Sequence, residues 1–71
     1  MTALRFRLAK NLVFYERLRF INNKQLAKKA GVSEEVITKY RNAKTKEPDL
    51  KILRKIAKAL EVTVSDLLKE D

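Results

Sequence analysis

The sequence contains no cysteine, no histidine and no tryptophan in its 71 residues. Without cysteine there is no disulfide framework and no thiolate metal site. The absence of histidine also removes the commonest general base and the usual zinc ligands. We therefore expect a binding protein that is not an enzyme and has no metal, no cofactor and no small-molecule ligand.

Glycine and proline are also scarce, with one residue of each. No alternating strand pattern extends beyond a few residues, so the sequence predicts an all-helical protein. No apolar run approaches the ~20 residues of a membrane-spanning helix, and no signal-peptide pattern opens the chain. We expect residues 1–71 to form a single domain that acts in the cytoplasm without contacting a membrane.

Positive charge is abundant, with a formal net charge of +8 at pH 7. Residues 1–31 contain eight Lys/Arg against one acidic residue, and residues 39–58 contain eight more against two. Residues 59–71 reverse the sign, with four acidic residues, Asp71 among them, against one lysine. This polarity indicates a face for an anionic partner and an acidic tail directed away from it. Plain solubility is the alternative explanation.

The first half of the chain predicts three helices. A long helix from Thr2 to Phe20 has one broad apolar face, made of Leu4, Leu8, Leu12, Tyr15 and Leu18. Asn22 and Gln25 form a capping-box pattern for a short helix that ends at Ala30, before Gly31. Ser33 caps a third helix that extends to about Arg41 or Asn42.

The second half predicts two more helices. Asp49 caps the fourth, whose apolar residues recur at intervals of three and four: Leu50, Leu53, Ile56, Ala57 and Leu60. Thr63 caps a short fifth helix with Asp66 in its first turn, and Leu67 and Leu68 face inward.

The stretch "KQLAKKAGVSEEVITKYRNAKTK" combines two short helices with a tight glycine turn, which is typical of a helix-turn-helix. In the third helix, Val36, Ile37 and Tyr40 share one side. The opposite side is polar, with Glu34, Glu35, Thr38, Lys39 and Asn42. A helix with one apolar side, called its back, and one hydrogen-bonding side, called its front, suits the major groove of DNA. An ordinary amphipathic surface helix would show the same pattern.

Three segments of the chain resemble the Cro/phage-repressor type of helix-turn-helix DNA-binding domain, also called the XRE family. They are "QLAKKAGVS", "NAKTKEP" and "LKILRKIAKALEVTVSDLL", and the resemblance covers roughly residues 8–69. It implies an all-α, compact five-helix bundle of the lambda-repressor-like kind, with the helix-turn-helix at the second and third helices. It also implies a sequence-specific regulator of repressor or Cro type that binds double-stranded DNA as a homodimer, with the recognition helix, about residues 33–42, in the major groove.

The resemblance also implies which residues meet DNA. The base-facing positions would be Ser33, Glu34, Glu35, Thr38 and Lys39. The phosphate backbone would be held by Asn23, Lys24, Asn42, Lys44, Thr45 and Lys46. Exposed helix N-termini, amides and flexible cations are the groups with which proteins hold phosphates, so the residue types fit these roles.

Three positions depart from the family pattern. Ala43 stands where the family usually has glycine, so we expect either that Asn42 is left-handed or that the turn differs. Asn23 replaces a glutamine and would have a shorter reach to phosphate. Glu16 and Arg41 reverse the family's pairing of an arginine in the first helix with a glutamate in the third. A reversed pair would keep the same link, whereas two unrelated surface charges are the alternative.

A second apolar stripe lies opposite the main apolar face of the first helix. It consists of Phe6, Val13 and Phe20, which are seven residues apart. The stripe either covers the C-terminal helix or an extended core, or forms a self-association surface.

Glu34 and Glu35 are unexpected at the leading edge of a helix that meets DNA, and three explanations remain open. They can complement the helix macrodipole, or accept a hydrogen bond from a cytosine amino group. Alternatively, this face has lost DNA binding and the chain is a helix-turn-helix scaffold for protein–protein interaction.

Overall fold

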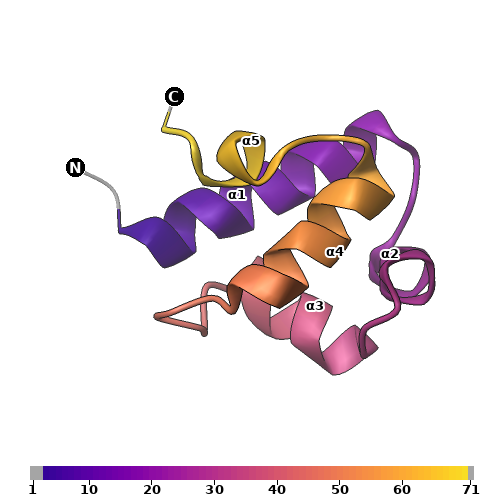
Figure 1. The fold of residues 1–71 in the computed structure, drawn as a ribbon, viewed down its shortest axis with the longest axis horizontal. Coiled ribbons are helices and arrows are strands. Elements are labelled where there is room, and N and C mark those ends of the chain that lie inside the picture. The colour runs from indigo at the N-terminus through magenta and orange to yellow at the C-terminus, as the bar shows by residue number, and fades with distance from the viewer. Residues whose placement is uncertain (1–2, 71) are drawn as a thin grey trace.

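The computed structural model describes residues 3–70, which form five helices around one core (Figure 1). The helices are α1 (Leu4–Leu18), α2 (Asn23–Ala30), α3 (Glu34–Arg41), α4 (Leu50–Leu60) and α5 (Val64–Leu68). Helix α1 packs against α3 and α5, α2 packs against α3 and α4, and α4 packs against α5. No strand occurs in the described part of the chain, so the predicted all-α, five-helix fold is confirmed.

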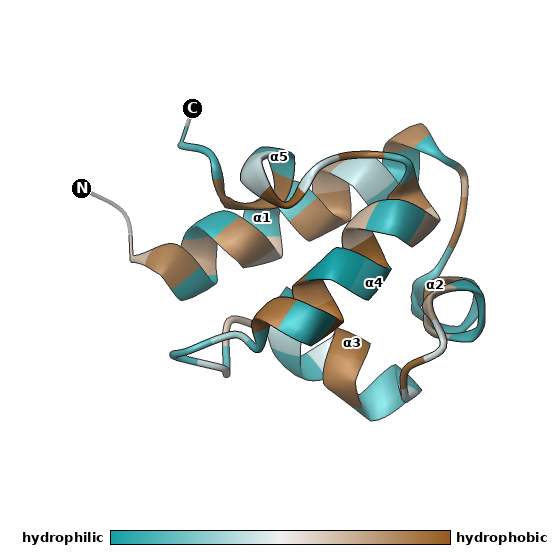
Figure 2. Cartoon of the chain, in the orientation of Figure 1, coloured by the Kyte–Doolittle hydropathy of each residue, from teal (hydrophilic) through white to brown (hydrophobic). Residues whose placement is uncertain are grey.

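The core contains one apolar face from each helix. Its fully buried side chains are Leu8, Leu12, Leu26, Ile37, Ile56, Leu60 and Leu67. Apolar and polar segments alternate along α1 and α4 in Figure 2, as expected for helices with one buried side. Burial of each large aliphatic side chain contributes roughly 1.5–3 kcal/mol, so this cluster is the main source of stability.

Capping residues fix where four of the helices begin. Asn22 and Gln25 form the predicted capping box of α2, and Ser33 accepts a hydrogen bond from the N–H of Val36 in α3. Asp49 caps α4, and Thr63 forms a second capping box with Asp66 at α5. Hydrogen bonds from the backbone and side chain of Thr63 lower the pKa of Asp66.

The structure corrects the C-terminal end of the predicted first helix. Thr2 lies outside the described residues, and α1 begins at Leu4. It ends at Leu18 rather than at Phe20, because Phe20 has a left-handed backbone with φ of 57°. The N–H of Ile21 then donates to the carbonyl of Glu16 at 3.0 Å and closes the turn.

Two leucines of the predicted apolar faces are half exposed. Leu18 is 52% exposed because it lies roughly a quarter turn away from the inward face of Leu8 and Leu12. Leu50 is 51% exposed, at the first position of α4. Both lie in terminal turns, where fewer neighbouring elements are available to cover a side chain.

Polar side chains of α1 and of its C-cap residue form hydrogen bonds to the C-terminal half of the molecule. Buried Asn11 donates to the carbonyl oxygens of Leu67 at 2.8 Å and Lys69 at 3.0 Å. Arg19 Nε donates to the carbonyl of Leu60 at 2.9 Å. These bonds satisfy carbonyls left without partners at the ends of α5 and α4.

No helix among residues 3–70 is both long enough and apolar enough to cross a membrane.

Candidate nucleic-acid interface

The turn between α2 and α3 sets the position of α3. Gly31 has φ of 75°, and its N–H and that of Val32 both donate to the carbonyl of Ala27, at 2.9 and 3.0 Å. A Cβ built on Gly31 would meet nothing within 4 Å. The position therefore favours glycine because of its left-handed backbone and not for lack of space.

Helix α3 has a buried back and an exposed front. Ile37 and Tyr40 are buried in the core, and Val36 packs partly against it. All five predicted base-facing residues are exposed: Ser33, Glu34, Glu35, Thr38 and Lys39. An α-helix with its side chains is about 10–12 Å across, so the major groove, which is about 12 Å wide, can admit α3.

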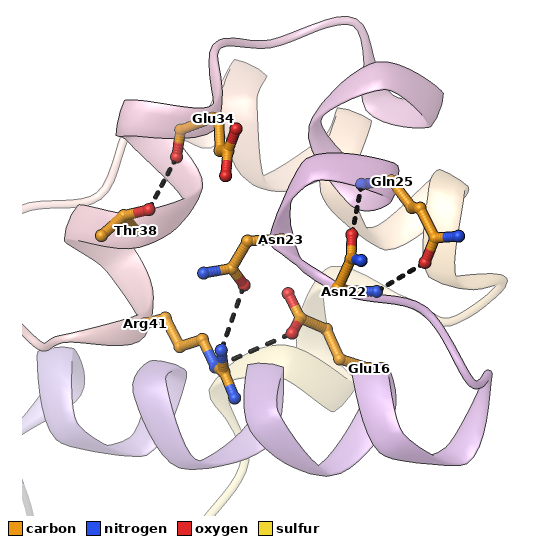
Figure 3. Close-up of polar contacts among 7 residues, drawn as sticks. All are labelled: Glu16, Asn22, Asn23, Gln25, Glu34, Thr38 and Arg41. Carbon is orange, nitrogen blue, oxygen red and sulfur yellow. Dashed lines mark hydrogen bonds and ion pairs between the residues drawn. The ribbon is translucent and has the colours of Figure 1, made fainter.

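Hydrogen bonds on this front leave specific groups available to a ligand. Ser33 Oγ accepts from the N–H of Val36 at 3.2 Å and can still donate. Thr38 Oγ1 donates to the carbonyl of Glu34 at 3.0 Å and can still accept, as Figure 3 shows. The front thus offers both a donor and an acceptor from its hydroxyl groups.

The two glutamates on the front differ in their surroundings. Glu35 Oε1 lies 3.5 Å from Lys39 Nζ, one turn along the exposed surface. The carboxylate of Glu34 has no ion-pair partner among residues 3–70. Glu35 therefore partly neutralises a cation of the front, whereas Glu34 presents an unneutralised charge.

A polar network joins α1, α2 and α3 behind this front. Arg41 Nε of α3 lies 3.7 Å from Oε1 of Glu16, which is buried in α1 (Figure 3). The two residues that the sequence pairs are therefore within ion-pair distance. Burial raises the pKa of Glu16 above its ordinary value, and the charge of Arg41 opposes that rise.

Asn23 at the start of α2 belongs to the same network. In the orientation drawn in Figure 3, its amide oxygen accepts from Arg41 Nη1 at 3.4 Å. Half a turn of the amide places its nitrogen 2.7 and 3.0 Å from the two carboxylate oxygens of Glu16. The second orientation is favoured because an amide oxygen facing a carboxylate is repelled. The side chain of Asn23 thus faces Glu16 and is only partly exposed.

The connection after α3 corrects one expectation. Asn42 is not left-handed, since its φ is −93°, and Ala43 has φ of 58° instead. The N–H of Lys44 then donates to the carbonyl of Lys39 at 3.0 Å. The alanine itself thus adopts the conformation for which glycine is usually required.

Tyr40 fixes the far end of this connection. Its hydroxyl oxygen accepts from the N–H of Asp49 at 2.9 Å, so the loop is fixed at the start of α4. Between these two points lie the predicted backbone-contacting residues of the loop. Asn42, Lys44 and Lys46 are exposed, and Thr45 is half-buried. Lys24, in the first turn of α2, is also exposed.

Sequence reasoning missed the role of Asn23 in the network and the bond from Asp49 to Tyr40. The sequence carried no signal for the first, because the burial of Glu16 that turns Asn23 toward it follows from the packing of α1 on α3. In the described part of the chain, no group of three or more histidine, cysteine, aspartate or glutamate residues could hold a metal ion. The arrangement offers hydrogen-bonding groups and cations over one exposed helix face.

Comparison with known proteins gives one match. A family model for the Cro/C1-type HTH DNA-binding domain matches residues 17–70, which contain α2 to α5 and the last two residues of α1. No curated protein and no solved structure matches the chain.

Proposed function

The chain belongs to the Cro/C1-type HTH DNA-binding domain family. On this premise we propose that it is a transcriptional repressor that binds double-stranded DNA in a sequence-specific manner. Family membership supports a DNA-binding regulator of transcription in general terms. The finer proposal is that α3 enters the major groove and reads base edges there. Such a protein works inside the cell, where its DNA ligand is.

The observation that carries the proposal is the exposed polar front of α3 above a fully packed back. The front combines two hydroxyl groups, two carboxylates and one ammonium group, from Ser33, Thr38, Glu34, Glu35 and Lys39. Base edges in the major groove present both donors and acceptors, so a mixed front of this kind can distinguish them.

Phosphate contacts would surround this front. The loop between α3 and α4, which we call the exit loop, carries the exposed cations Lys44 and Lys46. A third exposed cation, Lys24, lies on α2. We assign supporting polar contacts to Asn42 and Thr45. Because the Asn23 amide faces Glu16, we expect Asn23 to contact phosphate through its backbone N–H at the start of α2. These contacts position α3 without reading sequence.

Dimerisation on DNA is part of the proposal. One domain of this size makes few base contacts, and pairing on two-fold-related half-sites supplies the missing affinity. Domains of this family are typically non-enzymatic, and we assign no catalytic, cofactor or small-molecule role to the chain.

Selection from random duplexes, followed by binding measurements at increasing salt, tests the proposal. We expect enrichment of one motif with two-fold symmetry, and a selected duplex that binds at least roughly 10³-fold more tightly than a scrambled one. Affinity for both should fall steeply between about 50 and 200 mM salt, because phosphate contacts release counterions. Absence of duplex binding even at low salt would favour a helix-turn-helix scaffold for protein–protein interaction.

A further inference from the structure

The outer side of α1 and the turn after it expose several large apolar side chains that do not pack against the core. Phe6, Phe14, Leu18 and Phe20 are 50%, 58%, 52% and 92% exposed. The alternative that the stripe of Phe6, Val13 and Phe20 covers a helix or extends the core is therefore wrong. We call the surface of Phe6, Val13, Phe14, Arg17, Leu18 and Phe20 the α1 outer face.

This face is hollowed. A depression of about 630 Å³ is lined by Lys10, Val13, Phe14, Arg17, Leu18 and Phe20. Its volume lies within the range of pockets that hold a ligand. The ring of Phe14 stands edge-on against the ring of buried Tyr15, with centroids 5.1 Å apart, so one wall is fixed to the core.

Phe20 is the least expected residue on this face. Its φ of 57° is a conformation that glycine or asparagine adopts at lower cost. Its ring is almost wholly in water, so the fold recovers nothing from its apolar area. A phenylalanine that combines a left-handed backbone with an exposed ring is best explained by a contact that the folded monomer does not make.

The charges of this face indicate which partner fits. Arg17 lines the depression, and the guanidinium of Arg5 lies 4.9 Å from the ring centroid of Phe6. The only acidic residue of α1 is Glu16, which is buried on another side of the helix. Two copies of this face would bring like charges together in a chain that already carries +8.

We propose that the α1 outer face binds an acidic amphipathic helix of another protein. The partner's apolar side chains would enter the depression beside Phe14 and Phe20, and its carboxylates would meet Arg17. A hollow with aromatic walls favours an inserted helix over a flat lipid surface. Because α3 packs on a different side of α1, an occupied outer face leaves the front of α3 exposed. Phe6, Val13 and Phe14 precede the residues that match the family, so half of this surface lies outside the shared pattern.

The test is fluorescence anisotropy with two labelled helical peptides of about 18 residues, or five turns. Both carry leucine at intervals of three and four. One has glutamate at the flanking positions, and its control has glutamine. We expect the whole chain to bind the glutamate peptide at least roughly tenfold more tightly than the glutamine peptide.

Variants of the protein locate the site. Phe14→Ala and Phe20→Asn should each weaken binding of the glutamate peptide by roughly tenfold or more. Leu50→Ala is the matched control, because Leu50 is similarly exposed but lies on α4. Lys44→Ala on the exit loop should also leave peptide affinity unchanged, which separates this site from a general attraction to basic surface. Thermal melting confirms that each variant is folded, and Phe20→Asn should melt no lower than the parent.

Four outcomes would overturn the proposal. Equal peptide binding by the Phe14, Phe20 and Leu50 variants would place the site elsewhere, and equal binding of both peptides would exclude an acidic partner. Self-association of the parent that Phe20→Asn abolishes would make a second copy the occupant. Binding to phosphatidylserine vesicles, without peptide binding, would make the face a membrane contact. None of these results depends on DNA binding.

Discussion

Arg41 Nε in α3 lies 3.7 Å from Oε1 of Glu16 in α1, and the amide of Asn23 in α2 completes the contact. One buried carboxylate thereby links α1, α2 and α3. The partner arginine is partly accessible, with its side chain 35% exposed. The orientation of α3 therefore depends on a charge that is costly to bury and costly to leave unpaired.

The first prediction concerns the exchange of these charges. Glu16→Arg and Arg41→Glu should each destabilise the fold by about 2–4 kcal/mol, because each places two like charges together in a partly buried site. The double swap should recover at least half of the combined loss. Asn23 can serve either arrangement, since its amide both donates and accepts. Urea unfolding of the parent, the single variants and the double variant measures the coupling. Strictly additive losses would show that Glu16 and Arg41 do not interact.

The second prediction concerns pH. Because burial raises the pKa of Glu16 above 4.5, the folded state takes up this proton at a higher pH than the unfolded state does. Acidification from neutral pH through the raised pKa should therefore stabilise the parent relative to Glu16→Gln, until the difference levels off near pH 4.5. Urea unfolding of both proteins at a series of pH values isolates this group, since the other acids are common to both. A difference that moves in the opposite direction would mean that Arg41 and Asn23 outweigh burial.

The third prediction concerns the turn after α3. Ala43→Gly should stabilise the protein by about 0.5–1 kcal/mol, because the relief of left-handed strain exceeds the extra entropy of glycine in the unfolded chain. Ala9→Gly, in the middle of α1, is the control and should destabilise by about 1 kcal/mol. Thermal melting compares the two. Destabilisation by both substitutions would show that Ala43 is not strained.

The elements of this fold were predictable where local chemistry decides them. Asn22, Ser33, Asp49 and Thr63 cap helices because a short polar side chain can reach the free N–H groups of the next turn. Gly31 ends α2 for an equally local reason. Periodicity likewise predicted the buried back of α3, which leaves its polar residues exposed. These features require only the residues within one or two turns.

The remainder depended on contacts between distant segments. Asn11 is buried because it caps α5, which lies more than fifty residues away. Asn23 turns toward Glu16 because a buried carboxylate needs donors, and that burial follows from the packing of α1 on α3. The early end of α1 at Leu18 accompanies the bond from Arg19 to the carbonyl of Leu60. A pattern read along one helix contains none of this information.

The fourth prediction concerns the exit loop. Lys44→Ala and Lys46→Ala should each weaken binding to all duplexes about equally and reduce the salt slope by about one unit, because their exposed cations would meet phosphates. Lys58→Ala, at the other end of α4, is the control and should leave the slope unchanged. Affinities for a selected and a scrambled duplex at several salt concentrations measure both effects. A changed sequence preference with an unchanged slope would contradict the assignment.

The last prediction concerns Glu34 and Glu35, whose different surroundings separate the explanations for acidic residues on this front. Glu35 lies beside Lys39, so Glu35→Gln should free that cation as well as remove a negative charge, and should increase non-specific DNA affinity. Glu34→Gln should also increase it, by loss of charge alone.

The effect on base preference decides between the macrodipole and direct readout. If a carboxylate accepts from a cytosine amino group, Glu34→Gln or Glu35→Gln should relax or alter preference at a single operator position, measured by repeating the duplex selection. Both variants should lose only a few tenths of a kcal/mol in stability. The loss should be somewhat larger for Glu35→Gln, because this variant also loses the ion pair with Lys39. Unchanged preference in both would leave the macrodipole as the explanation. We expect the larger change from Glu34, because its carboxylate has no ion-pair partner within residues 3–70 and is the more available to a base.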